Sequence, residues 1–174
     1  SRGGKTMRSL CVSGGARWGK SRYAQARAEA TGLSPVFIAT AQAFDEEMRN
    51  RIVRHQADRG VEWETVEAPL KLAEAIELHA SPDRVLLVDC LTLWVTNLLI
   101  GDHDIPAAVR TLIETITVAQ GTLILVSNEV GLGIVPENQL ARRFRDEAGF
   151  LHQRVAACAN EVQLLCAGLN LQFK

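Results

Sequence analysis

This 174-residue chain contains Gly14-Gly15-Ala16-Arg17-Trp18-Gly19-Lys20-Ser21, the segment that is most indicative of its fold class. It fits the pattern G-x-x-x-x-G-K-[ST], in which glycines let backbone amides approach phosphate oxygens that a side chain would block. An apolar run at residues 10–13 precedes it and a helix-forming stretch at residues 22–30 follows it, as a phosphate-binding loop requires. We expect Lys20 to bridge the β and γ phosphates and Ser21 to bind Mg²⁺. The alternative is a chance glycine turn, but pattern and context together favour nucleotide binding.

Short apolar runs alternate with stretches of helical period along the rest of the chain. The runs at residues 36–40, 84–89 and 122–127 lack polar alternation, which is typical of strands covered on both faces. Pro69 and Pro106 fall near the first turn of their predicted helices, where a missing amide hydrogen costs nothing. This alternation predicts an α/β fold with a mainly parallel sheet. We predict strands at residues 10–13, 36–40, 84–89, 122–127 and 162–166, a weaker one at 61–66 and an edge strand at 170–173, with helices at 22–30, 45–59, 69–80, 106–119 and 137–159.

Composition places the chain among globular proteins. Hydrophobic residues make up 47% and charged residues 22%, so the disordered and fibrous classes are excluded. The formal net charge of −1 would not attract nucleic acid, so we expect no nucleic-acid partner. No apolar run is long enough for a membrane span, and we expect a cytoplasmic protein. We expect one P-loop nucleotide-binding domain at residues 8–174, preceded at residues 1–7 by a disordered end or cloning remnant.

The four cysteines are widely spaced and stand in apolar surroundings. A zinc site would require a C-x-x-C pair or a cluster with histidine, and the cysteines form neither. We expect them to be small buried hydrophobes. They are Cys11, Cys90, Cys158 and Cys166.

A carboxylate ends one of the fully apolar runs. Val85-Leu86-Leu87-Val88-Asp89 is similar to a Walker B segment, so Asp89 is a candidate to hold Mg²⁺ or to accept a proton from an attacking hydroxyl. The alternative is a structural aspartate that caps a helix over residues 90–99. A glycine-punctuated loop at residues 128–136 follows another run, and open parallel sheets place ligand contacts at such strand ends. Its candidate group is Glu129.

His55 lies on the predicted helix at residues 45–59. Helical spacing places it on one stripe with Met48, Ile52 and Arg59, which favours a half-buried structural histidine. A neutral imidazole is nevertheless a good nucleophile, and its ordinary pKa of about 6.5 leaves it largely unprotonated at neutral pH. From the residues alone both roles stay open.

Several segments together resemble one enzyme family. From about Leu10 to the C-terminus, the chain resembles the bifunctional adenosylcobinamide kinase/adenosylcobinamide-phosphate guanylyltransferases of cobalamin biosynthesis. The long blocks at residues 88–99 and 127–146 are more specific than the glycine loop. The segments are the loop at 14–21, Phe37-Ile38-Ala39-Thr40-Ala41, Asp45-Glu46-Glu47-Met48 with Arg51-Ile52 and His55, Val88-Asp89-Cys90-Leu91-Thr92-Leu93-Trp94-Val95-Thr96-Asn97-Leu98-Leu99, and residues 127–136 with Arg143-Phe144-Arg145-Asp146.

This resemblance implies a RecA-like sheet, a homotrimer, Mg²⁺ and two reactions on a corrinoid substrate. The first moves the γ-phosphoryl group of ATP or GTP to the aminopropanol hydroxyl of adenosylcobinamide. In the second, His55 attacks the α-phosphorus of GTP, releases pyrophosphate and passes GMP to adenosylcobinamide phosphate. Lys20 and Asp89 are the other catalytic groups, and Ser21 and Asp89 the metal ligands.

The family's nucleotide contacts also map onto this sequence. Glu67 suits guanine because one carboxylate can accept both the N1 and the N2 protons. The implied contacts are Gly14, Gly15, Ala16, Arg17, Trp18, Gly19, Lys20, Ser21, Ala39, Thr40, Ala41, Gln56, Ala57, Asp58, Arg59, Glu67 and Asp89.

The chain departs from the family pattern at three positions. Trp18 stands where a small residue is usual, His152 where asparagine is usual, and Asn160 where aspartate is usual. Two other classes remain beside the bifunctional enzyme. One is a P-loop small-molecule kinase with a structural His55. The other is a RecA-like NTPase or GTP-dependent switch that acts through a protein or nucleic-acid partner.

Overall fold

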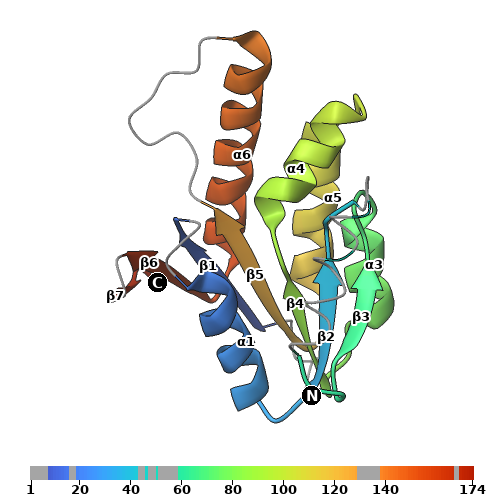
Figure 1. Cartoon of the computed structure of the whole chain (residues 1–174), viewed down its shortest axis with the longest axis vertical. Coiled ribbons are helices and arrows are strands. Elements are labelled where there is room, and N and C mark those ends of the chain that lie inside the picture. Colours follow the sequence, from blue (N-terminus) through green and yellow to red (C-terminus); the bar gives the residue numbers. More distant parts are fainter. Residues whose placement is uncertain are drawn as a thin grey trace.

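A mainly parallel sheet forms the centre of the molecule. The computed structural model describes residues 8–15, 19–42, 46, 50, 59–128, 138–166 and 169–174. Within them seven strands join one sheet in the order β3-β2-β4-β5-β1-β6-β7 (Figure 1). All neighbouring strands are parallel except β6 and β7, which are antiparallel. The predicted α/β fold is therefore confirmed. The elements are β1 (Arg8–Gly14), α1 (Lys20–Ala30), β2 (Ser34–Ala39), β3 (Glu64–Glu67), α3 (Leu72–His79), β4 (Arg84–Val88), α4 (Leu91–Ile100), α5 (Ile105–Val118), β5 (Thr122–Asn128), α6 (Gln139–Cys158), β6 (Glu161–Cys166) and β7 (Leu169–Gln172).

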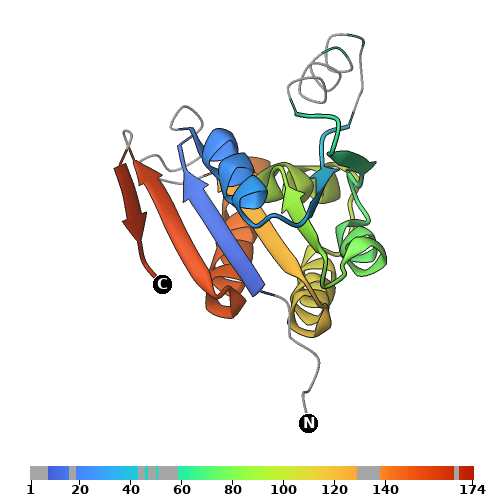
Figure 2. The same ribbon diagram turned by 90° about the horizontal axis from the view of Figure 1, so that it is seen from below.

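Helices cover both faces of this sheet. Figure 2 shows α1 on one face and α5 and α6 on the other. Helix α1 packs Ala24 and Ala28 against its face, and side chains of α3, α4, α5 and α6 form a larger core on the opposite face. Leu86 and Leu87 are successive residues of β4, so they point to opposite faces, and both are buried. The prediction of strands covered on both faces is confirmed.

Several predicted bounds are wrong in detail. Strand β3 begins at Glu64 rather than at residue 61, because Val61 lies fully exposed in a turn. Pro69 precedes α3 instead of lying in its first turn, since α3 begins after Lys71. Pro106 does lie in the first turn of α5, as predicted. The predicted helix at residues 45–59 lies outside the described residues, apart from positions 46, 50 and 59.

The four cysteines all lie in the described part of the chain and are free thiols. Cys11 is buried in the core, and burial raises the pKa of its thiol to about 11. The other three are only half-buried. The prediction of small buried hydrophobes therefore holds in full for Cys11 alone.

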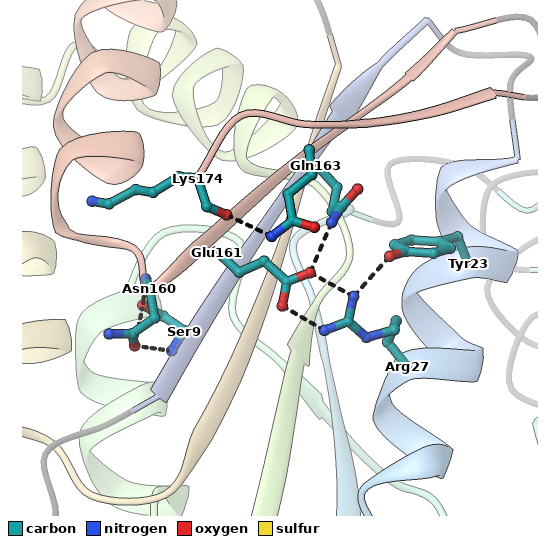
Figure 3. Close-up of polar contacts among 8 residues, drawn as sticks. Ser9, Tyr23, Arg27, Asn160, Glu161, Gln163 and Lys174 are labelled. Atoms are coloured by element: carbon teal, nitrogen blue, oxygen red, sulfur yellow. Dashed lines mark hydrogen bonds and ion pairs between the residues drawn. The ribbon is translucent and has the colours of Figure 1, made fainter.

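A polar cluster joins α1 to β6 (Figure 3). Arg27 of α1 donates two hydrogen bonds to the carboxylate of Glu161, at 2.6 and 2.8 Å, and a third to the Tyr23 hydroxyl at 2.7 Å. The Gln163 amide donates to the same carboxylate at 2.9 Å. Because α1 begins directly after the glycine loop, this cluster fixes the helix that supports the loop against the neighbouring part of the sheet.

Candidate nucleotide-binding site

The glycine loop has a backbone that its sequence requires. Gly14 ends β1 with φ of 145°, and a Cβ atom there would run into the carbonyl oxygen of Leu165 on β6. Gly19 has a left-handed backbone conformation, with φ of 79°, and directly precedes the first residue of α1. Both positions favour glycine because L side chains rarely adopt these conformations. The two described ends of the loop, where β1 finishes and where α1 begins, thus each require a glycine backbone.

Lys20 lies at the start of α1 with its side chain buried. Its Nζ atom donates a hydrogen bond to the carbonyl oxygen of Gly15 at 2.7 Å, which holds the ammonium group beside the loop. Ser21 follows it in the exposed first turn of α1. A helix N-terminus carries unpaired amides and a positive partial charge, so this end of α1 favours a phosphate group.

Asp89 directly follows β4 and is held by Thr40 from the end of β2. The Thr40 amide and hydroxyl both donate to Asp89 Oδ1, at 2.9 and 2.7 Å. Burial raises the pKa of Asp89 above its ordinary value, while these hydrogen bonds and the charge of Arg59 oppose the shift. Helix α4 is capped by Cys90, whose Sγ accepts the Leu93 amide, so the alternative of Asp89 as the helix cap is wrong.

Arg59 brings a permanent positive charge to this region. Its side chain is buried, and its guanidinium carbon lies 3.4 Å from the centroid of the Phe37 ring, a close cation–π contact. Phe37 is two residues from Ala39 on β2, so both side chains leave the same face of the sheet. The guanidinium group of Arg59 therefore packs on the face that also carries α1.

Glu67 ends β3 at the edge of the sheet. It stands opposite Ala39 of β2 in the strand register, and the next amide, of Ala68, donates to the Ala39 carbonyl at 2.8 Å. Glu67 is exposed and lines an open, largely apolar cavity of about 450 Å³ together with Pro69 and Lys71. A carboxylate beside an apolar cavity suits a planar ring that carries N–H donors.

The described site residues gather where the parallel strands of the sheet finish, at their carboxyl-terminal ends. They follow the carboxyl ends of four parallel strands, which is where open α/β sheets bind ligands. Direct contacts join Lys20 to Gly15 and Thr40 to Asp89. The residues so placed are Gly14, Gly15, Gly19, Lys20 and Ser21 after β1, Ala39, Thr40 and Ala41 at the end of β2, Glu67 on β3 and Asp89 after β4. Ala16, Arg17, Trp18, His55, Gln56, Ala57, Asp58 and Glu129 lie outside the described residues.

A polar cluster near these strand ends joins three residues that no sequence pattern connects. Thr92 of α4, Ser127 of β5 and His152 of α6 are linked through Ser127 Oγ, which hydrogen-bonds to His152 Nε2 and lies 3.2 Å from Thr92 Oγ1. The Asn128 amide donates to the same Thr92 oxygen at 2.9 Å. His152 therefore holds the end of β5 and, through Ser127, is linked to Thr92 of α4. Its partners lie tens of residues away, so no local spacing could have revealed them.

Fold and site together define a P-loop nucleotide-binding protein. The strand before the glycine loop, β1, and the strand before Asp89, β4, are separated by β5, which is the RecA-like arrangement. Comparison with known proteins then identifies the family. Residues 10–173 match the family described as cobinamide kinase / cobinamide phosphate guanyltransferase, and the chain belongs to it. The resemblance seen in the sequence is confirmed.

Individual relatives agree with this family. The chain is 48% identical over 170 residues to the bifunctional adenosylcobalamin biosynthesis protein CobP of Pseudomonas aeruginosa, covering 97% of this chain and 98% of the relative. It is 42% identical over 180 residues to the bifunctional adenosylcobalamin biosynthesis protein CobU of Escherichia coli, covering 95% and 99%. A solved structure from Pyrococcus horikoshii OT3 aligns with a TM-score of 0.51 at 7% identity, over 96% of this chain and 86% of that one. This last likeness concerns the fold alone.

Proposed function

We propose that this chain catalyses two consecutive reactions of cobalamin nucleotide-loop assembly, as an adenosylcobinamide kinase and as an adenosylcobinamide-phosphate guanylyltransferase. The family match across residues 10–173 carries the proposal. The relatives named as bifunctional adenosylcobalamin biosynthesis proteins support it. The acceptor is then a corrinoid, and the nucleotide donors are ATP or GTP in the first reaction and GTP in the second.

In the kinase reaction, the aminopropanol hydroxyl oxygen bonds to the γ-phosphorus of the nucleotide. The bond from that phosphorus to the bridging oxygen breaks, and the nucleoside diphosphate leaves. Lys20, held beside the loop by Gly15, stabilises negative charge on the phosphoryl oxygens together with the loop amides. The carboxylate of Asp89, which directly follows β4, is proposed either to hold the metal or to accept the hydroxyl proton.

Mg²⁺ is the proposed metal, and Ser21 and Asp89 are the residues that would hold it. Both offer hard oxygen donors, and Mg²⁺ takes few protein ligands because it keeps water and binds phosphate oxygens. When bound, the ion neutralises charge on the phosphates. Thr40 fixes the carboxylate of Asp89 through two hydrogen bonds, so the orientation of this ligand is set before any nucleotide binds.

In the second reaction, we propose that an imidazole nitrogen of His55 bonds to the α-phosphorus of GTP while pyrophosphate leaves. A phosphate oxygen of adenosylcobinamide phosphate then attacks the same phosphorus, the histidine leaves, and adenosylcobinamide-GDP forms. Covalent catalysis divides one difficult transfer into two displacements. The buried charge of Arg59, four positions after His55, supports a phosphate role for this segment, and Glu67 is the proposed partner of guanine.

The family resemblance implies the assembly, and the composition of the chain favours the location. We propose a homotrimer that acts in the cytoplasm. In the part of the chain that the structure describes, no helix is both long and apolar enough to cross a membrane.

Intact-protein mass spectrometry tests the covalent step. After incubation with GTP and Mg²⁺ we expect one added GMP, which adenosylcobinamide phosphate discharges. His55→Ala should lose this adduct and keep phosphoryl transfer to adenosylcobinamide. His103→Ala is the matched control, because His103 is an exposed histidine after α4 and should keep the adduct.

Other outcomes would select the alternative classes. Phosphoryl transfer without any protein-bound GMP would leave a small-molecule kinase. Nucleotide hydrolysis that a protein or nucleic acid stimulates, without transfer to a corrinoid, would indicate an NTPase or switch.

A further inference from the structure

Asn97 is a buried amide on a mainly apolar helix, α4. It lies on α4, which packs Leu91, Trp94 and Leu98 into the core, and the residue is 5% exposed. Removing an amide from water is costly unless its N–H groups find acceptors. The partners of Asn97 therefore show what this residue holds in place.

Both partners of the Asn97 amide are main-chain carbonyls at the site edge of the sheet. Nδ2 lies 2.7 Å from the Thr40 oxygen and 3.0 Å from the Pro69 oxygen. An amide NH₂ group has two hydrogens, so it can donate one to each carbonyl. Thr40 directly follows β2, and Pro69 comes two residues after the end of β3. One side chain thus joins the ends of two strands.

Each of these carbonyls belongs to a segment that carries a site carboxylate. The amide and hydroxyl of Thr40 hold Asp89, at the proposed phosphate and metal end of the nucleotide. Pro69 is two residues from Glu67, at the proposed guanine end, and this segment is held further by Trp94, whose Nε1 donates to the Leu70 carbonyl at 2.9 Å. Asn97 therefore links the two ends of the proposed nucleotide site.

We propose that Asn97 is a positioning residue that sets the spacing between Glu67 and the Thr40–Asp89 pair, so that one nucleotide can meet both carboxylates at once. The inference rests on the proposed function, in which Glu67 binds guanine and Asp89 serves the phosphates. Without the amide, β2 and β3 stay paired, but the segments that follow them lose their common anchor, and Glu67 shifts relative to the Thr40–Asp89 pair. The loss falls on recognition of the base.

Comparison of GTP with inosine triphosphate tests the proposal. Inosine triphosphate lacks the 2-amino group, so it forgoes one hydrogen bond to a carboxylate, which is worth about tenfold or more in affinity. Affinities of the full chain are measured by calorimetry in EDTA, so that GMP transfer does not accompany binding. We expect the wild type to prefer GTP by about tenfold, and Asn97→Leu, which is similar in size but has no donor, to reduce this ratio to about threefold or less. Thr96→Val is the control, because among the described residues the Thr96 hydroxyl bonds within α4, to the Thr92 carbonyl, and the ratio should stay at the wild-type value.

A second variant protects the test against misfolding. Asn97→Ser keeps one donor and leaves room for water near the two carbonyls, so it should fold and give an intermediate ratio. A purely structural role for Asn97 would lower stability or the active fraction and leave the ratio of the two affinities unchanged. An unchanged ratio in folded Asn97→Leu or Asn97→Ser overturns the inference.

Glu67→Gln separates the inference from the proposed function. If this substitution abolishes the preference of the wild type for GTP, the guanine role of Glu67 stands, and the Asn97 variants alone decide the inference. If the wild type binds both nucleotides equally, or Glu67→Gln changes nothing, the guanine role fails and the inference fails with it. Failure of GMP transfer to His55 would affect the proposed function and leave this test intact.

Discussion

The ion pair between Arg27 and Glu161 should make the stability of this protein depend on pH in the acid range. The bidentate contact with Arg27 lowers the pKa of the Glu161 carboxyl from 4.5 to about 2 (Figure 3). Such a group stabilises the fold fully above its unfolded pKa, and this contribution is lost as the pH falls through the folded pKa. The window for this pair therefore runs from about pH 4.5 to about pH 2.

The magnitude follows from the same pKa. Each pKa unit corresponds to about 1.4 kcal/mol, so the full shift of the Glu161 pKa would contribute about 3 kcal/mol to the free energy of unfolding. The side chains of Arg27 and Glu161 are 36% and 23% exposed, so water screens the pair and we reduce this value to about 1 kcal/mol. Glu161→Gln removes the charge and keeps the shape of the side chain. At pH 7 it should lower the free energy of unfolding by about 1 kcal/mol.

Urea unfolding followed by tryptophan fluorescence measures this effect. The difference in free energy of unfolding between wild type and Glu161→Gln should decrease steadily from pH 5 towards pH 2.5. It should also decrease in 1 M salt, because exposed charges are screened. Asp146→Asn is the control, since its contact with Arg145 is long, at 3.7 Å, and Asp146 is 73% exposed. A gap that stays constant over this pH range, or widens in acid, would refute the reasoning.

Two further predictions concern stability, and each compares a matched pair of variants. Trp94→Phe should lower the free energy of unfolding by about 1–3 kcal/mol more than Trp63→Phe does. The Trp94 indole donates to the Leu70 carbonyl, whereas the buried Trp63 N–H has no hydrogen-bond partner among the described residues. Equal costs in urea unfolding would contradict this. Gly14→Ala should cost about 1–3 kcal/mol more than Gly19→Ala. Both glycines have positive φ, but only at Gly14 would the new Cβ meet a described backbone atom, the Leu165 carbonyl oxygen. Thermal unfolding at matched pH checks the pair, and similar melting temperatures would count against a steric role for Leu165.

Local patterns predicted those parts of the fold that depend on near neighbours. The apolar runs of β4 and β5 became buried strands, and Pro106 lies in the first turn of α5, because burial and proline geometry act over a few residues. The same reasoning failed at Pro69 and at the start of β3, where packing against the rest of the chain sets the bounds. Propensity is a weak guide at such ends, because a few residues on either side satisfy it equally well.

The candidate site divides in the same way. Gly14, Lys20 and Asp89 were recognisable because their chemistry and spacing are local, and the structure places them at one edge of the sheet. Thr40 and Glu67 entered only through the resemblance to a family. Asn97 stood inside a quoted motif with no role, and the one available signal was a polar residue among apolar neighbours on a helix. His55, the proposed nucleophile, stays a prediction.

The α/β class, the phosphate-binding loop and the carboxylate after β4 could be predicted from the amino-acid sequence, because each depends on residues only a few positions apart. The three-dimensional fold was needed to show the strand order, the contact of Arg27 with Glu161, the hydrogen bond from the Ser9 amide to Asn160, and the hydrogen bonds from Asn97 to Thr40 and Pro69. These pairs are separated by 28 to 151 residues along the chain. They meet because burial of apolar strands and helices brings distant segments together, and no local spacing encodes which distant polar group will be there.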